Sequence, residues 1–129
     1  MYVLDSSAII ELLSGTSLGK KVNDFVGDAP LAATSISISE VVSGAKGKAF
    51  EAALGFFNSV LILDFDKESA FESVEIENAL RKAGRLIERT DIFIAAICRK
   101  HDLWLVSCDP DFTNVKSIKT KIITQVASV

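Results

Sequence analysis

The sequence has few of the residues that mark disulfide-stabilised or zinc-binding proteins. Only two of its 129 residues are cysteines, Cys98 and Cys108, and only one is a histidine. The cysteines show no CxxC or Cys/His spacing, so neither a structural zinc site nor a disulfide framework is expected. Cys98 is expected to be a small buried apolar residue, and the role of Cys108 stays open.

Long apolar runs, repeats and linkers are also missing. No stretch approaches the roughly 18 uninterrupted apolar residues of a membrane span, and no basic region precedes an apolar run near the first residue. We therefore expect a cytoplasmic protein with no membrane partner. Repeats, low-complexity runs and Pro/Gly/Ser-rich segments are absent. Together with 49% apolar composition, this predicts a single domain over residues 1–129.

The chain has no basic excess, since its formal net charge is −3. This first argues against a nucleic-acid ligand, because phosphate binding usually shows as a surplus of Lys and Arg. However, if four of the acidic side chains bind a metal ion, their combined charge exceeds the net negative charge of the chain. The composition is therefore compatible with a metal-dependent nuclease.

Short apolar runs alternate with amphipathic helical segments along the chain. Strands are expected at residues 2–4, 30–34, 60–63 and 103–107, with an edge strand at 118–124. Helices are expected from about 8 to Gly15, at 18–26, from Ser37, at 48–58, at 67–83 with Asp66 as the N-cap, and at 91–101 with Thr90 as the N-cap. This alternation predicts an α/β fold, with a central, mostly parallel sheet and helices on both of its faces.

Four acidic residues stand where strands end or helices are expected to begin. Asp5 and Asp109 each follow a strand, and Glu40 and Asp91 are each expected to open a helix. In such sheets, ligands gather outside the carboxyl ends of the strands. Hard divalent cations prefer oxygen ligands, and a pair of them can activate water for phosphodiester hydrolysis. The four side chains are therefore candidate metal ligands.

Each of these carboxylates also has a simpler explanation. Glu40 could complete a capping box with Ser37, Asp91 could interact with a helix dipole, and Asp109 could start a turn. Asp5 is harder to explain in this way, because a carboxylate directly after a buried strand needs a partner that offsets its desolvation.

Other acidic residues compete with the four. Asp111, two residues beyond Asp109, is the main rival for the last position. Asp64 and Asp66 are interpreted as residues that precede and cap a helix, and Asp102 lies at the amino end of a strand, away from the expected site.

Four short motifs carry a resemblance to a known family. They are Val3-Leu4-Asp5-Ser6-Ser7, Ser39-Glu40-Val41, Asp91-x-x-Ile94-Ala95-Ala96 and Ser107-x-Asp109-x-Asp111-Phe112. In this order and spacing the sequence resembles the PIN domain, and within it the VapC toxins of bacterial and archaeal toxin–antitoxin pairs. The resemblance covers nearly the whole chain.

The resemblance implies a metal-dependent ribonuclease. Its four acidic positions would be Asp5, Glu40, Asp91 and Asp109, with the hydroxyls of Ser6 and Ser107 beside them. It also implies Mg²⁺ or Mn²⁺ as cofactor, RNA as substrate, a homodimer, and a VapB-type antitoxin whose tail enters the acidic groove. Two residues depart from the family pattern: Ser7 stands where Asn is common, and Ser107 where Thr is common.

Basic residues near the acidic positions are candidate RNA contacts. Arg81, Lys82, Arg85 and Arg89 precede Asp91, and cations beside a metal site can hold a single-stranded phosphate backbone. Arg85 and Arg89 are the preferred candidates, followed by Lys46, which comes after Glu40. The alternative is a solvated helix face.

The helix expected at 48–58 is apolar on more than half of its circumference. One stripe comprises Phe50, Ala53, Leu54 and Phe57, and a second comprises Ala49, Ala52 and Phe56. Such a helix is either buried between layers or offers its second stripe to another chain. We expect a homodimer.

Two other functions compete with a toxin nuclease. A phospho-receiver domain would need an acidic pair after the first strand and a Lys after a late one, but Ser6-Ser7 and Ser107-Cys108 stand there. A PIN-domain RNA-processing or quality-control nuclease, or a non-catalytic RNA-binding PIN scaffold, remains possible on sequence grounds. The complete acidic set argues against the scaffold.

Overall fold

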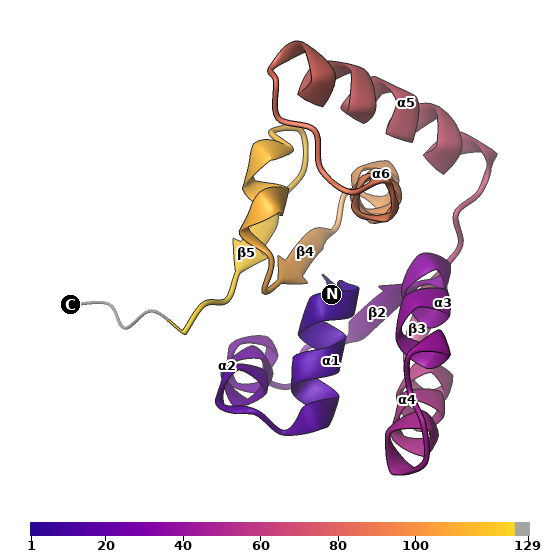
Figure 1. Cartoon of the computed structure of the whole chain (residues 1–129), viewed down its shortest axis with the longest axis vertical. Coiled ribbons are helices and arrows are strands. Elements are labelled where there is room, and N and C mark those ends of the chain that lie inside the picture. The colour runs from indigo at the N-terminus through magenta and orange to yellow at the C-terminus, as the bar shows by residue number, and fades with distance from the viewer. Residues whose placement is uncertain (126–129) are drawn as a thin grey trace.

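The computed structural model describes residues 1–125, which form five strands and their covering helices (Figure 1). In chain order the elements are β1 (Tyr2–Leu4), α1 (Ser6–Ser14), α2 (Ser17–Val26), β2 (Leu31–Thr34), α3 (Ser35–Ser43), α4 (Lys48–Ser59), β3 (Leu61–Leu63), α5 (Lys67–Lys82), α6 (Arg89–His101), β4 (Trp104–Ser107), the 3₁₀ helix η1 (Pro110–Asn114) and β5 (Thr120–Ile122). The strands make one sheet in the order β3-β2-β1-β4-β5, and every neighbouring pair is parallel. The predicted α/β fold is confirmed, and the sheet among the described residues is wholly parallel.

Helices cover both faces of the sheet, as expected. Successive strand residues point to opposite faces, so Val3 belongs to the core cluster that α5 and α6 cover, and Leu4 to the cluster that α1, α2, α3 and α4 cover. The interior of α6 is buried on nearly all sides, from Ile92 to Cys98 apart from half-buried Phe93. Cys98 is thus a buried apolar residue, as expected, and burial raises the pKa of its thiol well above the usual range.

Side-chain caps fix where several helices begin. Asp66 accepts a hydrogen bond from the backbone amide of Ser69, which confirms its expected capping role for α5. Thr34 caps α3 through the amide of Ser37, so α3 begins at Ser35 rather than at Ser37. The expectation was wrong because Thr34 both ends β2 and supplies the cap.

The start of α6 also differs from the expectation. The helix begins at Arg89 after Glu88, so Thr90 lies inside the first turn and does not cap it. Asp91 does lie in that first turn, as expected.

The strand order determines where a ligand site can form. From β1 the chain moves outward to β2 and β3, then returns to β4 on the other side of β1 and continues to β5. The carboxyl ends of β1 and β4 therefore flank the point where the direction of winding changes, which is where open α/β sheets bind ligands. None of the described helices is long and apolar enough to cross a membrane.

Candidate metal centre

Asp5 occupies the end of β1 at this switch point and is only 2% exposed. Its carboxylate accepts hydrogen bonds from the Ser107 hydroxyl at 2.6 Å and from the Ala8 amide at 2.9 Å, so it also caps α1. Ser7 Oγ lies 2.8 and 2.9 Å from its two oxygens. Burial raises the pKa of Asp5, the charge of Asp109 raises it further, and the hydrogen bonds oppose this rise. Asp5 is therefore held in one orientation before any cation binds.

Two serine hydroxyls join the turn after β1 to the turn after β4. Ser107 Oγ, which donates to Asp5, accepts a hydrogen bond from the Asp109 amide at 2.9 Å. Ser7 Oγ accepts one from the Cys108 amide at 3.0 Å. Ser107 thus lies beside Asp5 and Asp109, and its supporting role at a metal site stays a prediction. Ser7 was not predicted as a site residue, although its place two residues after Asp5 was a usable signal.

Asp91 lies close to other carboxylates. It is half-buried in the first turn of α6, and burial is the largest cause that raises its pKa to about 7. The charges of Asp109, Asp5, Glu40 and Glu88 contribute in that order. A group of carboxylates whose like charges repel one another and raise a pKa is a frequent sign of a functional site.

Glu40 reaches this group from the middle of α3. Its carboxylate accepts hydrogen bonds from Ser6 Oγ at 2.7 Å and from Thr90 Oγ1 at 3.0 Å. A capping box with Ser37 is excluded, because Thr34 caps the helix and Glu40 lies inside it. Thr90 was predicted as an N-cap, but in the structure its hydroxyl donates a hydrogen bond to Glu40. The predicted neighbour Ser6 does lie beside the acidic group.

Asp109 and Asp111 have different surroundings. Asp109 caps η1 by accepting a hydrogen bond from the Asp111 amide at 2.9 Å, and Asp111 is exposed. The charge of Asp109 raises the pKa of both Asp5 and Asp91, which places its carboxylate near theirs. This favours Asp109 as the fourth acidic residue, and the choice stays a prediction.

The donor set fits a hard divalent cation in its chemistry. All four side chains are carboxylates, and burial together with the neighbouring negative charges raises the pKa of Asp91, an effect that a bound cation would oppose. Within residues 1–125, no three His, Cys, Asp or Glu side chains converge closely enough to hold a metal as they stand. The charges of Asp109, Asp5 and Glu40 all act on Asp91, but within the described residues the four carboxylates do not form a coordination shell.

The residues predicted to contact RNA differ in whether they form ion pairs with acidic side chains. Arg89 forms an ion pair with Glu77 at 3.3 Å, and Glu77 also pairs with Arg81. Arg85 and Lys46 are exposed, and neither makes an ion pair within residues 1–125. Arg85 is thus the better candidate of the two arginines.

Cys108 lies beside the acidic group but is a poor nucleophile. It is half-buried, and burial followed by the charges of Asp5 and Glu11 raises the pKa of its thiol to about 11. Thiolate chemistry near neutral pH is therefore disfavoured.

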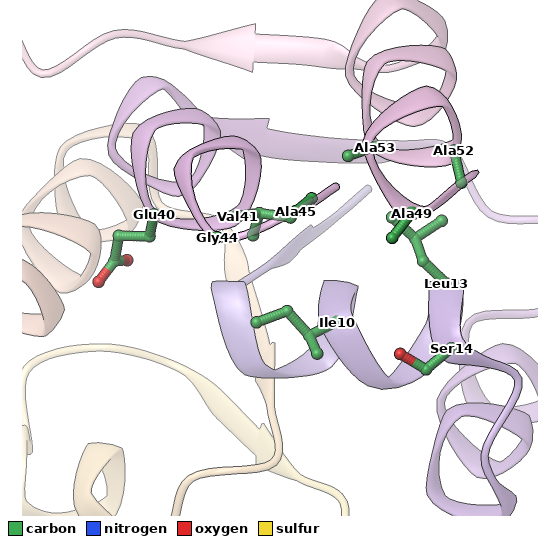
Figure 2. Close-up of a pocket in the computed structure, with 10 residues that line it drawn as sticks. All are labelled: Ile10, Leu13, Ser14, Glu40, Val41, Gly44, Ala45, Ala49, Ala52 and Ala53. Atoms are coloured by element: carbon green, nitrogen blue, oxygen red, sulfur yellow. The ribbon is translucent and has the colours of Figure 1, made fainter. Parts of the chain in front are cut away.

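An apolar groove begins at Glu40 and runs away from the carboxylates. It has a volume of about 250 Å³ and lies between α1, α3 and α4. Figure 2 shows Ile10 and Leu13 of α1 facing Val41 of α3 and Ala49 of α4, with the Glu40 carboxylate at one end. We call this surface the α1–α4 groove.

The α1–α4 groove changes the interpretation of α4. Ala49 and Ala52, two members of its second apolar stripe, line the groove, and Phe56 is half-buried against the core. The second stripe therefore faces its own chain more than the sequence pattern indicated.

Comparisons with known proteins agree with this architecture. Residues 2–118 match the family model of the PIN domain, and the chain therefore belongs to the PIN domain family. A comparison with curated proteins found no match.

Solved structures with the same fold include VapC toxins. VapBC2 from Rickettsia felis, bound to a DNA fragment from its promoter, has a TM-score of 0.79 at 21% identity, covering 95% of this chain and 98% of that one. FitAcB from Neisseria gonorrhoeae has a TM-score of 0.75 at 20% identity, covering 93% and 96%. VapC20 from Mycobacterium tuberculosis, a sarcin-ricin loop cleaving toxin, has a TM-score of 0.71 at 16% identity, covering 90% and 95%. At these identities the likeness concerns the fold.

Proposed function

We propose that this chain is a divalent-metal-dependent endoribonuclease and the toxin of a VapBC-type toxin–antitoxin pair. The observation that carries the proposal is the grouping of acidic residues at the carboxyl ends of β1 and β4, where the Ser107 hydroxyl bonds both the Asp5 carboxylate and the Asp109 amide. Burial, followed by the charges of Asp109, Asp5 and Glu40, raises the pKa of Asp91 beside them. Membership of the PIN family and the fold shared with VapC20, described as a sarcin-ricin loop cleaving toxin, support the same activity.

Each carboxylate would have a defined part in the reaction. Asp5, Glu40, Asp91 and Asp109 would hold Mg²⁺ or Mn²⁺, which supplies an activated water and stabilises the leaving oxygen of the phosphodiester. Asp5 is pre-oriented by its three hydrogen-bonding neighbours. Glu40 is oriented by Ser6 and Thr90. Arg85 carries positive charge that can hold the RNA backbone.

The first test is cleavage of a mixed pool of single-stranded RNA with Mn²⁺, Mg²⁺ or EDTA. Asp5→Asn and Asp91→Asn should reduce metal-dependent cutting to background, because each nearly isosteric change removes a negative ligand. Asp64→Asn is the matched control, since Asp64 also follows a strand but is exposed, and it should cut like the parent. Equal cutting by all variants, or none by the parent with any metal, would contradict the proposal.

A further part of the proposal concerns the antitoxin. The α1–α4 groove is apolar along its length and ends at Glu40. It suits an apolar segment of a partner that ends in a cationic side chain, which could reach the carboxylates and block them. VapBC and FitAcB complexes share this fold. A small gene directly upstream would supply the partner for the test.

The groove can be tested separately from the nuclease. Ile10 is 48% exposed in the groove, and Phe71 is 65% exposed on α5. Ile10→Glu should abolish co-purification with the upstream protein, whereas Phe71→Glu should leave it intact. The reverse pattern would place the partner elsewhere.

A homodimer completes the proposal. After folding, exposed apolar residues remain at Leu54 of α4, at Leu61 of β3, and at Phe71 and Val74 of α5. Light scattering should give twice the chain mass, and Leu54→Glu on α4 should reduce it to that of a single chain. Loss of the dimer in Phe71→Glu instead would move the interface to α5. If the parent protein itself has the mass of a single chain, this part of the proposal is wrong.

A further inference from the structure

A second apolar cleft shares no lining residue with the α1–α4 groove, and of its lining residues only Arg85 has been given a role so far. It has a volume of about 250 Å³ and separates the C-terminal end of α5 from the segment that follows η1. Its apolar walls include Ala79 and Leu80 on one side and Val115 on the other. Pockets for drug-sized ligands start at about 300 Å³, so this space suits a group about the size of one ring system. We call it the α5–η1 cleft.

The rim of the α5–η1 cleft is polar and positively charged. Arg85 and Lys116 are its charged lining residues, and Asn114 and Ser117 add an amide and a hydroxyl. None of the residues that line it is Asp or Glu. The positive rim and the apolar walls together favour an anionic ligand with an apolar part.

The two cations on this rim are not neutralised by neighbouring carboxylates. Neither Arg85 nor Lys116 takes part in an ion pair within residues 1–125, although Lys116 Nζ donates to the Thr113 carbonyl at 2.9 Å. By contrast, Arg81 and Arg89 share Glu77. Of the four basic residues between Arg81 and Arg89, two are thus paired with Glu77, while Lys82 and Arg85 make no ion pair within residues 1–125.

Both walls of the cleft continue from the acidic site. Arg85 lies in the loop that leads into α6, whose first turn carries Asp91. Asn114 ends η1, whose first residue follows Asp109. Figure 1 shows the α5–α6 connection passing near the segment between β4 and β5. The cleft and the acidic site therefore share two segments of the chain, the loop before α6 and the 3₁₀ helix η1.

We propose that the α5–η1 cleft binds one unpaired base of the RNA, while Arg85 and Lys116 contact the adjoining phosphates. The inference rests on the proposed ribonuclease function and adds a subsite that selects single-stranded RNA. A base inserted between apolar walls must be unstacked from its neighbours, so a paired strand would not fit. Single-strand binding commonly combines stacking of bases on aromatic side chains with phosphate contacts to cations. Here the aliphatic walls at Ala79, Leu80 and Val115 would take the place of the aromatic side chains.

The test measures binding of a fluorescein-labelled, random-sequence RNA decamer to the full chain in its Asp5→Asn form, which keeps the RNA intact. Ala79→Phe fills the cleft from an exposed helix position, and Arg85→Ala with Lys116→Ala removes its cations. Lys20→Ala on α2, also exposed, is the control for loss of charge. Thermal melts confirm that every variant is folded.

The expected result has three parts. Ala79→Phe weakens binding by roughly tenfold, and the parent binds an abasic decamer as weakly as Ala79→Phe binds RNA. The double cation variant lowers the slope of log affinity against log salt by about 1.4, as expected for two lost single-strand phosphate contacts. Lys20→Ala binds like the parent.

Other results would overturn the inference. If Ala79→Phe binds RNA like the parent, or if the abasic decamer binds as tightly as RNA, no base enters the cleft. If the double cation variant keeps the parent's salt slope, the phosphates lie elsewhere. Cleavage by wild-type protein is measured in parallel. If wild-type protein cleaves RNA but binding does not depend on the cleft, only the cleft proposal is contradicted. If binding depends on the cleft but wild-type protein does not cleave RNA, only the nuclease proposal is contradicted.

Discussion

The hydroxyl of Ser107 lies 2.6 Å from the carboxylate of Asp5, although 102 residues separate them in the chain. Both side chains are buried, so this bond is shielded from water and joins the two central strands at their carboxyl ends. It also connects the acidic site to the stability of the fold, because the same hydroxyl accepts a hydrogen bond from the Asp109 amide.

Ser107→Ala should therefore affect both stability and metal binding. A hydrogen bond to a charged, buried group contributes about 1.5–3 kcal/mol, so the free energy of unfolding in urea should fall by about that amount. Loss of a group that orients a ligand typically lowers metal affinity about 10- to 100-fold. Ser59→Ala, at the exposed end of α4, is the control and should change stability by less than about 0.5 kcal/mol.

Thr90→Val should release Glu40 without disturbing the core. Thr90 donates to Glu40 between α6 and α3, and its replacement has nearly the same shape. We expect cleavage to fall by about tenfold with little change in melting temperature. Thr113→Val, which removes an exposed hydroxyl on η1, is the control. If Thr90→Val cuts RNA at the parent rate, Glu40 does not need this hydrogen bond.

The metal-free protein should lose stability as the pH rises. The pKa of Asp91 is about 7 in the folded chain against 3.8 for the free side chain, so the folded state binds more protons between these values. Stability is then highest below pH 3.8, apart from other groups, and this contribution is lost as the pH approaches 7. In EDTA, the melting temperature should fall by a few degrees from pH 5 to pH 8.

Added Mn²⁺ should reverse this effect mainly at the higher pH, where Asp91 is ionised. Asp91→Asn removes the titrating group, so its melting temperature in EDTA should depend less on pH and respond less to Mn²⁺. A parent protein whose metal-free stability rises from pH 5 to pH 8 would contradict this account of Asp91.

Two glycines on helices should respond to alanine in opposite directions. At Gly19 on α2, an added Cβ would lie 2.0 Å from the Glu11 carbonyl oxygen of α1, so Gly19→Ala must push the two helices apart. We expect a loss of about 3 kcal/mol in the free energy of unfolding. At Gly55 on α4 nothing lies within 4 Å, and Gly55→Ala should gain about 0.5–1 kcal/mol through helix propensity. Urea titration of both variants tests the pair.

The order of strands and helices could be predicted because apolar periodicity is a local property. Boundaries were less accurate where one residue serves two elements, as Thr34 does in ending β2 and capping α3. The 3₁₀ helix after Asp109 was not predicted, since it depends on the fit of Phe112 into the core. The parallel direction of neighbouring strands could be predicted because strands and helices alternate along the chain.

The acidic site was partly predictable for a similar reason. Asp5 stands out in the sequence because a carboxylate directly after a buried strand is costly without partners. The hydrogen bonds from Thr90 to Glu40 and from Ser7 to Asp5 were not predicted. The first depends on how α3 packs against α6, which no local pattern contains.

The position of β1 in the sheet has a consequence during synthesis of the chain. This strand is made first, yet one of its two neighbours is β4, residues Trp104–Ser107. A nascent chain that has left the ribosome without β4 lacks Ser107 and Asp109, so Asp5 has neither its shortest hydrogen bond nor its acidic neighbour. Any reaction at these carboxylates therefore begins only after β4 has been translated and has paired with β1.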